Sequence, residues 1–170
     1  MKPTVDLPEN AGKAVTLQQM DTYMAFKMAF PKPVSEDAHL RHILRFYVAR
    51  ALAKSGASAV LVRPLVRLDD QRLSVDVAAS RDGRTVLAIC EPAGVTAQTV
   101  AALDVLKDAE DTEVILVHSR FASADPVPAR FAPQLASKAF RLMSVVPPPF
   151  DDVLEYDIWM FELTFREAMA

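Results

Sequence analysis

Apolar residues follow a helical period in two segments of the N-terminal part of the chain. Leucine and methionine recur at helical spacing after Thr16, which predicts a Met-rich helix within residues 16–30. A second and more continuous apolar stripe runs from Leu40 to Leu52, and Ser35 before it is a favoured N-cap residue. Residues 1–14 carry no such periodicity. The sequence therefore predicts two helices after a loose N-terminal segment.

The middle of the chain is organised as β-structure. Apolar runs predict four strands there: Ala59–Leu68, Leu73–Ala79, Thr85–Glu91 and Glu113–His118. Pro64 interrupts the first run, which is typical of an edge strand or a bulge. A helix of about fourteen residues, capped by Thr96, is expected between the third and fourth strands. A strand that follows such a helix is expected to lie parallel to the strand before it, through a right-handed crossover.

The C-terminal third gives weaker signals. Residues Ala129–Leu142 read as a helix, and Met143–Val146 as a short strand. The apolar residues of the tail, 153–170, fit neither period, so helix and strand both remain open. A segment this apolar is expected to be buried, against its own core or against another subunit.

These patterns predict an α/β fold in three parts. We expect an N-terminal extension with the Met-rich helix at 1–34, a core with a mixed β-sheet flanked by helices at 35–146, and an apolar tail at 147–170. The tail and the 16–30 helix are the expected contacts of a homo-oligomer or of a protein partner.

Composition narrows the class of protein. Hydrophobic residues make up 51% of the 170 residues and charged residues 24%, as in a globular domain with a real core. No apolar stretch approaches the roughly 18 residues of a membrane span, so no membrane partner is expected. With a single cysteine, an internal disulfide is excluded and a cytoplasmic location is expected. No glycine-rich phosphate-binding loop is present.

Charge is distributed unevenly along the chain. The net charge is −3, which argues against a protein that coats nucleic acid over its whole surface. Between Ala38 and Thr85, however, nine Lys and Arg stand against four Asp and Glu, whereas the remainder has ten against eighteen. A local basic surface on an acidic protein is therefore expected.

Two acidic residues stand on neighbouring strands. Asp82-Gly83 between two β-rich runs is a strong hairpin signal, since both turn positions require positive φ. With these two residues at the centre of the turn, Asp76 and Glu91 fall on the same sheet face as diagonal neighbours, about 7–8 Å apart. Both acids adjoin apolar residues, where a carboxylate seldom enters without a partner. The pair therefore predicts a shared site in one cleft.

The order of helix, three meandering strands, helix and strand, with acids on the second and third strands, resembles the restriction-endonuclease-like fold of the PD-(D/E)XK nuclease superfamily. The resemblance covers residues 35–119. It implies that Asp76 and Glu91, joined by Glu36 on the first helix, bind Mg²⁺. Two carboxylates on adjacent strands are suitable ligands, since Mg²⁺ prefers oxygen and keeps several waters. The cation would activate a water for phosphodiester hydrolysis.

The sequence departs from the family at its catalytic lysine. The resemblance places that residue at position 93, which is alanine here. Alanine supplies neither a charge nor a hydrogen bond, so either another residue takes this role or the site is inactive. The candidates are Gln98 and Lys107 on the following helix and Arg63 or Arg67 on the first strand, and the resemblance favours Gln98. A loss of this kind costs transition-state stabilisation of about 3–4 kcal/mol.

Three functions remain open from the sequence. The leading hypothesis is a nuclease-like domain with a degenerate metal site that acts in nucleic-acid binding or assembly, with Arg41, Arg45, Arg63 and Arg67 on the DNA backbone. The second is an active Mg²⁺-dependent DNA endonuclease in which Asp76, Glu91 and Gln98 are catalytic. The third is a structural homo-oligomer that binds no nucleic acid.

Overall fold

The computed structural model describes residues 2–6, 12–119, 125–136, 138–145 and 155–169. A six-stranded sheet has the order β2-β3-β6-β7-β8-β9, and a three-stranded sheet has the order β1-β4-β5. The strands are β1 Thr4–Asp6, β2 Lys13–Ala14, β3 Ser58–Val62, β4 Leu65–Leu68, β5 Gln71–Ser74, β6 Val77–Arg81, β7 Arg84–Cys90, β8 Thr112–Ser119 and β9 Arg141–Val145. The first four strands of the larger sheet are antiparallel neighbours, while β8 and β9 continue it in parallel. The predicted α/β fold with a mixed sheet is confirmed.

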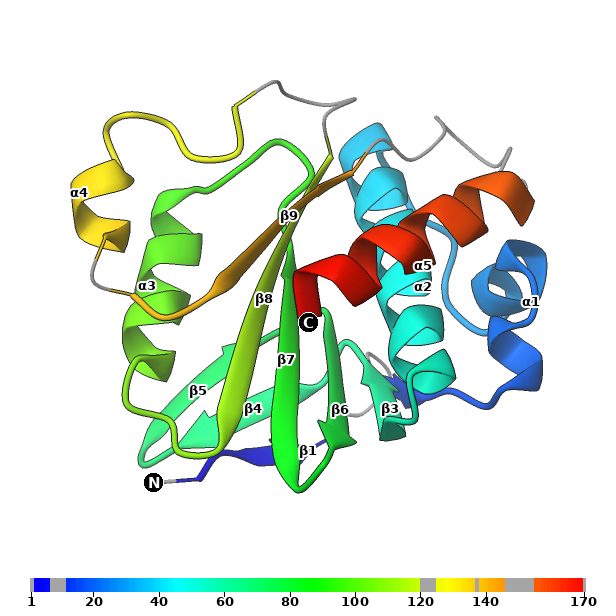
Figure 1. Ribbon diagram of the computed structural model, residues 1–170, viewed down its shortest axis with the longest axis horizontal. Helices are drawn as coiled ribbons and strands as arrows, with labels where there is room; N and C mark the ends of the chain where they lie inside the picture. The colour runs from blue at the N-terminus through cyan, green and yellow to red at the C-terminus, as the bar shows by residue number, and fades with distance from the viewer. Residues whose placement is uncertain (1, 7–11, 120–124, 137, 146–154, 170) are drawn as a thin grey trace.

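Helices flank both faces of the larger sheet (Figure 1). They are α1 Tyr23–Met28, α2 Glu36–Lys54, α3 Ala97–Leu106, α4 Ala132–Leu135 and α5 Glu155–Met169, with a short 3₁₀ helix at Gln18–Met20. The predicted caps of the two central helices are confirmed: the Ser35 hydroxyl accepts from the Ala38 N–H, and Thr96 forms a capping box with Thr99. These caps fix where α2 and α3 begin.

The two sheet faces bury separate apolar cores. On β7, Val86, Ala88 and Cys90 face the core that contains α1, α2 and α5, whereas Leu87 and Ile89 face the core that contains α3. This alternation follows the two-residue period of a strand. Because residues 86–90 of β7 are buried on both faces, this part of the strand is apolar throughout. Glu91 lies just beyond the strand, and by the same alternation it falls on the α3 face together with Leu87 and Ile89.

The Asp-Gly hairpin forms as predicted. Arg81 pairs with Arg84 and the register continues to Val77 opposite Ala88. Asp82 and Gly83 have φ of 52° and 76°, the positive values that this tight turn requires. The register is regular up to Val77 and changes at Asp76, whose N–H donates to the carbonyl of Ala88. The second core strand therefore begins one residue after the acid.

Two predicted strands are each divided between the sheets. The run Ala59–Leu68 becomes β3 and β4, which separate at Arg63 and Pro64, and the run Leu73–Ala79 becomes β5 and β6, which separate at Val75 and Asp76. Arg63 has φ of 57° at this bend. The two bends are hydrogen-bonded to each other, from Arg63 N to Asp76 O (2.8 Å) and from Val75 N to Pro64 O (3.3 Å). Asp76 thus lies at a corner between two sheets, not inside one strand.

The N-terminal part of the chain forms strand pairs that were not predicted and a shorter helix than was predicted. Residues 4–6 pair with β4, and residues 13–14 pair with β3, so the segment 1–14 contributes an edge strand to each sheet. The Met-rich helix of 16–30 is divided: Thr16 caps a 3₁₀ turn, and α1 starts only after Thr22, which caps it. The apolar spacing alone did not reveal this second cap.

The predicted helix Ala129–Leu142 is wrong. Among the described residues of this range only the four of α4 are helical, and Arg141 and Leu142 belong to strand β9, Arg141–Val145, which pairs in parallel with β8. The short strand predicted from Met143 is confirmed over its described residues. Met143 of β9 is buried in the core beneath α5. Pairing with an open sheet edge outweighed the local helical pattern, as tertiary context often does.

The described part of the tail, residues 155–169, is helical and packs on the chain's own core. Phe161 and Phe165 of α5 are buried, with Phe161 4.9 Å from the Tyr47 ring of α2. Arg50 and Glu162 form an ion pair between the two helices. The sequence pattern did not distinguish a helix from a strand for this segment, and the structure shows a helix over Glu155–Met169. None of the helices in the described ranges combines the length and the apolar character that a bilayer span requires.

Candidate functional site: an arginine-bridged carboxylate pair

A cavity of about 260 Å³ opens at the corner between the two sheets. Strand bends, α2 and the start of α3 all contribute to its lining. Its polar residues are Arg41, Arg45, Arg63, Ser74, Asp76, Glu91, Gln98 and Thr99. The chain therefore brings both acids and three arginines, separated by up to fifty positions, into one small volume.

Asp76 is held by two strong hydrogen bonds. Its Oδ1 accepts from Arg45 Nε at 2.7 Å, and its Oδ2 accepts from the main-chain N–H of Cys90 at 2.7 Å. The carboxylate therefore takes the place of a main-chain acceptor at the point where β6 leaves β7. Since its side chain is only 7% exposed, this acid depends on these donors for its charge to be tolerated.

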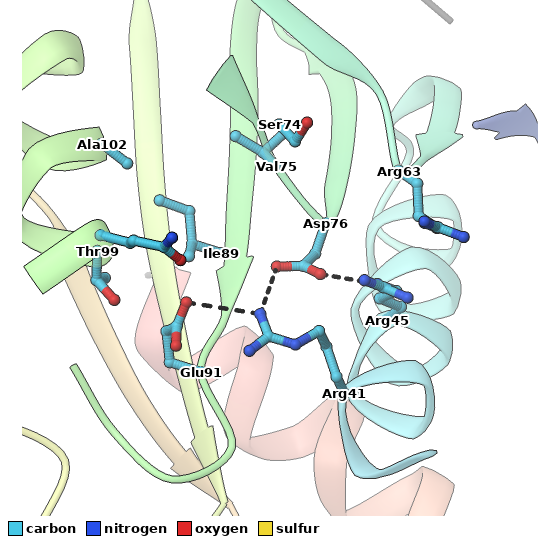
Figure 2. A pocket seen from close by; sticks show the side chains of 11 residues that line it. Arg41, Arg45, Arg63, Ser74, Val75, Asp76, Ile89, Glu91, Thr99 and Ala102 are labelled. Carbon is cyan, nitrogen blue, oxygen red and sulfur yellow. Dashed lines mark hydrogen bonds and ion pairs between the residues drawn. The ribbon is translucent and has the colours of Figure 1, made fainter. Parts of the chain in front are cut away.

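Arg41 lies between the two carboxylates (Figure 2). Its Nη1 is 3.8 Å from Asp76 Oδ2 and 3.5 Å from Glu91 Oε1. The same nitrogen donates to the carbonyl of Cys90 at 2.5 Å. Burial lowers the pKa of Arg41, but the charges of Asp76 and Glu91 raise it by more, so the net shift is upward. A permanent cation therefore occupies the space between the acids.

Glu91 is the less well compensated of the two acids. Burial raises its pKa, and the nearby charge of Asp76 raises it further, while Arg41 opposes both effects. Thr99 at the start of α3 lines the same cavity and lowers the pKa of Glu91, and it was not singled out from the sequence. Its position three residues after the Thr96 cap was the available signal. The result is a carboxyl that protonates more readily than an exposed glutamate.

The predicted substitute for the lysine, Gln98, lines the cavity, where it is exposed. Ala93 does not line it, because the strand ends at Cys90 and the chain turns, with Gly94 N donating to Glu91 O at 3.0 Å. The position two residues after Glu91 is therefore not on a strand. A lysine there would not have the alternation that directs it into the cleft.

The structure does not bring Glu36 to the two acids. Glu36 is exposed in the first turn of α2 and does not line the cavity. Within the described ranges no three His, Cys, Asp or Glu side chains form a group suited to a metal ion. The expected set of Glu36, Asp76 and Glu91 is thus not assembled, because α2 directs Arg41 and Arg45 to the acids instead.

The donor set does not fit Mg²⁺ as it stands. Both oxygens of Asp76 already accept strong hydrogen bonds, and a guanidinium lies within 4 Å of each acid. Mg²⁺ needs near-octahedral oxygen coordination and free carboxylate lone pairs. A divalent ion would have to displace Arg41 from between the acids.

The four predicted nucleic-acid-binding arginines divide into two groups. Arg41, Arg45 and Arg63 line the cavity, whereas Arg67 lies on β4 and pairs with Asp6 at 2.7 Å. Figure 2 shows the Arg63 guanidinium directed away from Asp76, and no ion pair to it is present among the described residues. Arg63 is thus the cavity arginine whose charge is not already used by a carboxylate.

Comparison with known proteins gives limited information. No protein-family model matches the sequence, and no curated protein sequence matches it. Among solved structures, protein VC1899 from Vibrio cholerae aligns with a TM-score of 0.49 and 14% identity, over 93% of this chain and 47% of that one. Can2 from Sulfobacillus thermosulfidooxidans, solved with cyclic tetra-adenylate, aligns at 0.49 and 10%, over 95% and 60%. The protein AF1548 aligns at 0.48 and 15%, over 75% and 67%.

The chain spans about half of the length of VC1899 and 60% of Can2. Scores and identities this low transfer neither a ligand nor an activity.

Proposed function

We propose that this chain is a nuclease-like domain whose metal site has become an arginine–carboxylate network, and that it binds phosphate groups of nucleic acid without hydrolysing them. The observation that carries the proposal is the position of Arg41, 3.8 Å from Asp76 and 3.5 Å from Glu91. A guanidinium stands where a hydrolytic enzyme of this fold needs a divalent cation. Both acids are present, but the Arg41 guanidinium occupies the space that a metal ion would need.

The charge of the cavity favours an anion. Three arginines line it against two carboxylates, and burial makes one of those carboxyls easier to protonate. Arg45 engages Asp76 through Nε, which leaves its terminal nitrogens for other partners. Arginine binds phosphate oxygens through paired N–H donors and is well suited to such a site. Arg63 and Arg45 are the residues we assign to phosphate contact.

The groups that phosphodiester hydrolysis requires, a free metal site and a catalytic lysine, are not assembled in this cavity. The carboxylates are bridged by the guanidinium of Arg41, and the family's lysine position is alanine in a turn outside the cavity. Gln98 lines the cavity and is neutral, so it supplies a hydrogen bond without a charge. Binding needs only the arginines, and these are present.

Fluorescence anisotropy with a labelled single-stranded and a labelled duplex DNA of the same length tests the proposal. We expect salt-sensitive binding without cleavage in Mg²⁺ or Mn²⁺, since phosphate contacts release counterions. Arg63→Gln should weaken binding about tenfold and reduce the salt dependence by one charge. Arg84→Gln is the matched control, because Arg84 pairs with Glu113 at the hairpin end and does not line the cavity.

Two results would overturn the proposal. Nicking of plasmid DNA in Mg²⁺ or Mn²⁺ that Asp76→Ala abolishes would identify an active endonuclease. Absence of DNA binding at low salt, together with a dimeric mass that is lost when residues 153–170 are deleted, would identify a structural homo-oligomer. The outer face of α5 favours that second candidate, since Trp159, Met160 and Leu163 are 54%, 38% and 37% exposed.

A further inference from the structure

A second cavity of about 280 Å³ adjoins the arginines. It lies between the connector that joins α1 to α2, residues 30–34, and the first turns of α2. Arg41, Arg45 and Arg63 line both cavities. The two hollows therefore form neighbouring compartments with a shared set of cations.

The second compartment combines apolar walls with cations. Phe30, Pro33 and Val34 supply the apolar surface, and Lys32 adds a fourth cation to the three arginines. Asp37 is the carboxylate in this lining, and it is 3.9 Å from Arg41. The mixture is what an aromatic or heteroaromatic group attached to an anion requires.

His42 belongs to the same lining and carries a polar atom, Nε2, that is covered by neighbouring protein atoms. It is 3% exposed, and its Nε2 has no hydrogen-bond partner in the described part of the chain. Its ring contacts Phe26 and Phe30, at centroid distances of 4.8 and 5.0 Å. A buried nitrogen without a partner is uncommon, since it loses its hydrogen bonds to water and gains none from the protein. A ligand with a complementary donor or acceptor would satisfy it, provided that the side chains covering Nε2 move aside.

The charge state of His42 restricts the kind of ligand. Burial, and then the charges of Arg45 and Arg63, lower its pKa to about 3. The imidazole is therefore neutral near pH 7 and offers one donor and one acceptor. A neutral ring of this kind complements the edge of a heterocycle better than it complements a phosphate.

We propose that this second compartment is a nucleobase site, with the phosphate of the same nucleotide on the shared arginines. The proposal rests on the proposed function, because the arginines must first hold the phosphate. The base stacks against Phe30 and the connector, and its edge meets His42. The ligand class is thus a nucleoside phosphate, free or as one unit of a single strand. A duplex does not fit this assignment, since its bases are already paired and stacked.

The size of the compartment agrees with a single base. Its volume of about 280 Å³ lies close to the lower limit of about 300 Å³ for small-molecule pockets. Stacking on an aromatic side chain tolerates any base, so binding with little sequence preference is expected.

Calorimetric titration of the full chain with AMP, ribose 5-phosphate and adenosine tests the assignment. AMP should bind at least tenfold more tightly than ribose 5-phosphate, a difference of about 1.4 kcal/mol. His42→Phe keeps a ring in the aromatic cluster and removes Nε2, and Phe30→Leu keeps apolar volume and removes the stacking face. Both should reduce the tenfold preference toward one, with ribose 5-phosphate binding unchanged. Met24→Ser, at an exposed position that lines neither cavity, should leave all affinities unchanged.

The source of the nucleotide is resolved by an eight-residue oligo-dA and an abasic strand of equal length. Tighter binding of oligo-dA than of AMP assigns a single strand, and equal binding assigns a free nucleotide; both agree with the base site. Equal affinities for AMP and ribose 5-phosphate, both weakened by Arg63→Gln, would overturn the base site and leave phosphate binding intact. Absence of binding for every probe would overturn phosphate binding itself, and the base site with it.

Discussion

The main-chain N–H of Arg63 donates a hydrogen bond to the carbonyl of Asp76 at 2.8 Å. The chain passes between the two sheets at both residues, from β3 to β4 at Arg63 and from β5 to β6 at Asp76. This bond joins Arg63, whose guanidinium has no ion pair among the described residues, to Asp76, whose carboxylate accepts two hydrogen bonds. The corner is therefore both the structural junction of the two sheets and the site of the cavity. A change at either residue is expected to affect stability and binding together.

Asp76 should be essential for stability as well as for the site. Asp76→Asn removes the charge that compensates Arg45 and places an amide opposite the Cys90 N–H, so we expect a loss of about 3 kcal/mol in the free energy of unfolding. Urea denaturation measures it. In a double-mutant cycle with Arg45→Met, the second change should recover part of the loss. Strict additivity of the two losses would contradict the proposed pairing.

Removal of Arg41 should open the space between the acids. Wild-type protein should show no change in melting temperature on addition of EDTA or of millimolar Mg²⁺. Arg41→Met should lower stability by about 2 kcal/mol, because Glu91 loses its cation, and should gain stabilisation by Mg²⁺ or Mn²⁺. Differential scanning fluorimetry with and without the ions measures both effects. Stabilisation of the wild type by Mg²⁺ would show that the metal ion displaces Arg41 from between the two acids, and would contradict this prediction.

His42 should make the fold sensitive to mild acid. Its pKa falls from the ordinary 6.5 to about 3 in the folded chain, so between these values the unfolded chain binds a proton that the folded chain does not. The contribution of His42 to stability is therefore complete above pH 6.5 and is lost as pH falls toward 3. The full loss amounts to roughly 5 kcal/mol at about 1.4 kcal/mol per pKa unit. Urea denaturation between pH 7.5 and 4.5 measures the part of this loss that falls above pH 4.5, about 2.7 kcal/mol.

His42→Phe is the control for this pH dependence. Phenylalanine retains the ring contacts with Phe26 and Phe30 and cannot be protonated, so the curve of stability against pH should become flatter. Glu91 acts in the opposite direction, because its raised pKa favours the folded state at low pH. Its contribution remains in the variant. Identical slopes for wild type and variant would assign the acid sensitivity to other groups.

The two turn glycines should differ in their tolerance of alanine. At Gly83, where φ is +76°, an added Cβ meets no atom within 4 Å, so Gly83→Ala should cost about 1 kcal/mol from backbone strain alone. At Gly94, where φ is +100°, the Cβ would lie 3.0 Å from the carbonyl oxygens of Asp125 and Pro126. Gly94→Ala should cost about 3 kcal/mol. Equal melting temperatures for the two variants would contradict this difference.

The two faces of α5 should respond differently to truncation. Phe165 is 1% exposed, so Phe165→Ala should cost about 3–4 kcal/mol in unfolding free energy. Leu163 is 37% exposed, so Leu163→Ala should cost less than about 1 kcal/mol. Light scattering on Leu163→Ala also tests the outer face as a homo-oligomer contact, since a dimer formed there should dissociate more readily. An unchanged dimer would place its interface elsewhere.

Local patterns determined most of the secondary structure. The Asp82-Gly83 turn, the Ser35 and Thr96 caps and the apolar run of β8 each depend on a few neighbouring residues, and each formed as predicted. The α/β class with a mixed sheet follows from their order. These features needed no long-range information, because turn geometry, capping and strand period are fixed within a few positions.

Tertiary structure alone decided the site. The sequence placed Asp76 and Glu91 on adjacent strands and marked Arg41 and Arg45 as basic residues four positions apart on one helix. It did not reveal that α2 inserts both arginines between and beside the acids, or that strands divide at Arg63 and Asp76. It also extended a helix over Arg141 and Leu142, the first two residues of β9, because pairing with a sheet edge outweighs local propensity. Ion pairs between residues some thirty to fifty positions apart depend on how helix and sheet pack, and no periodicity in the chain encodes that distance.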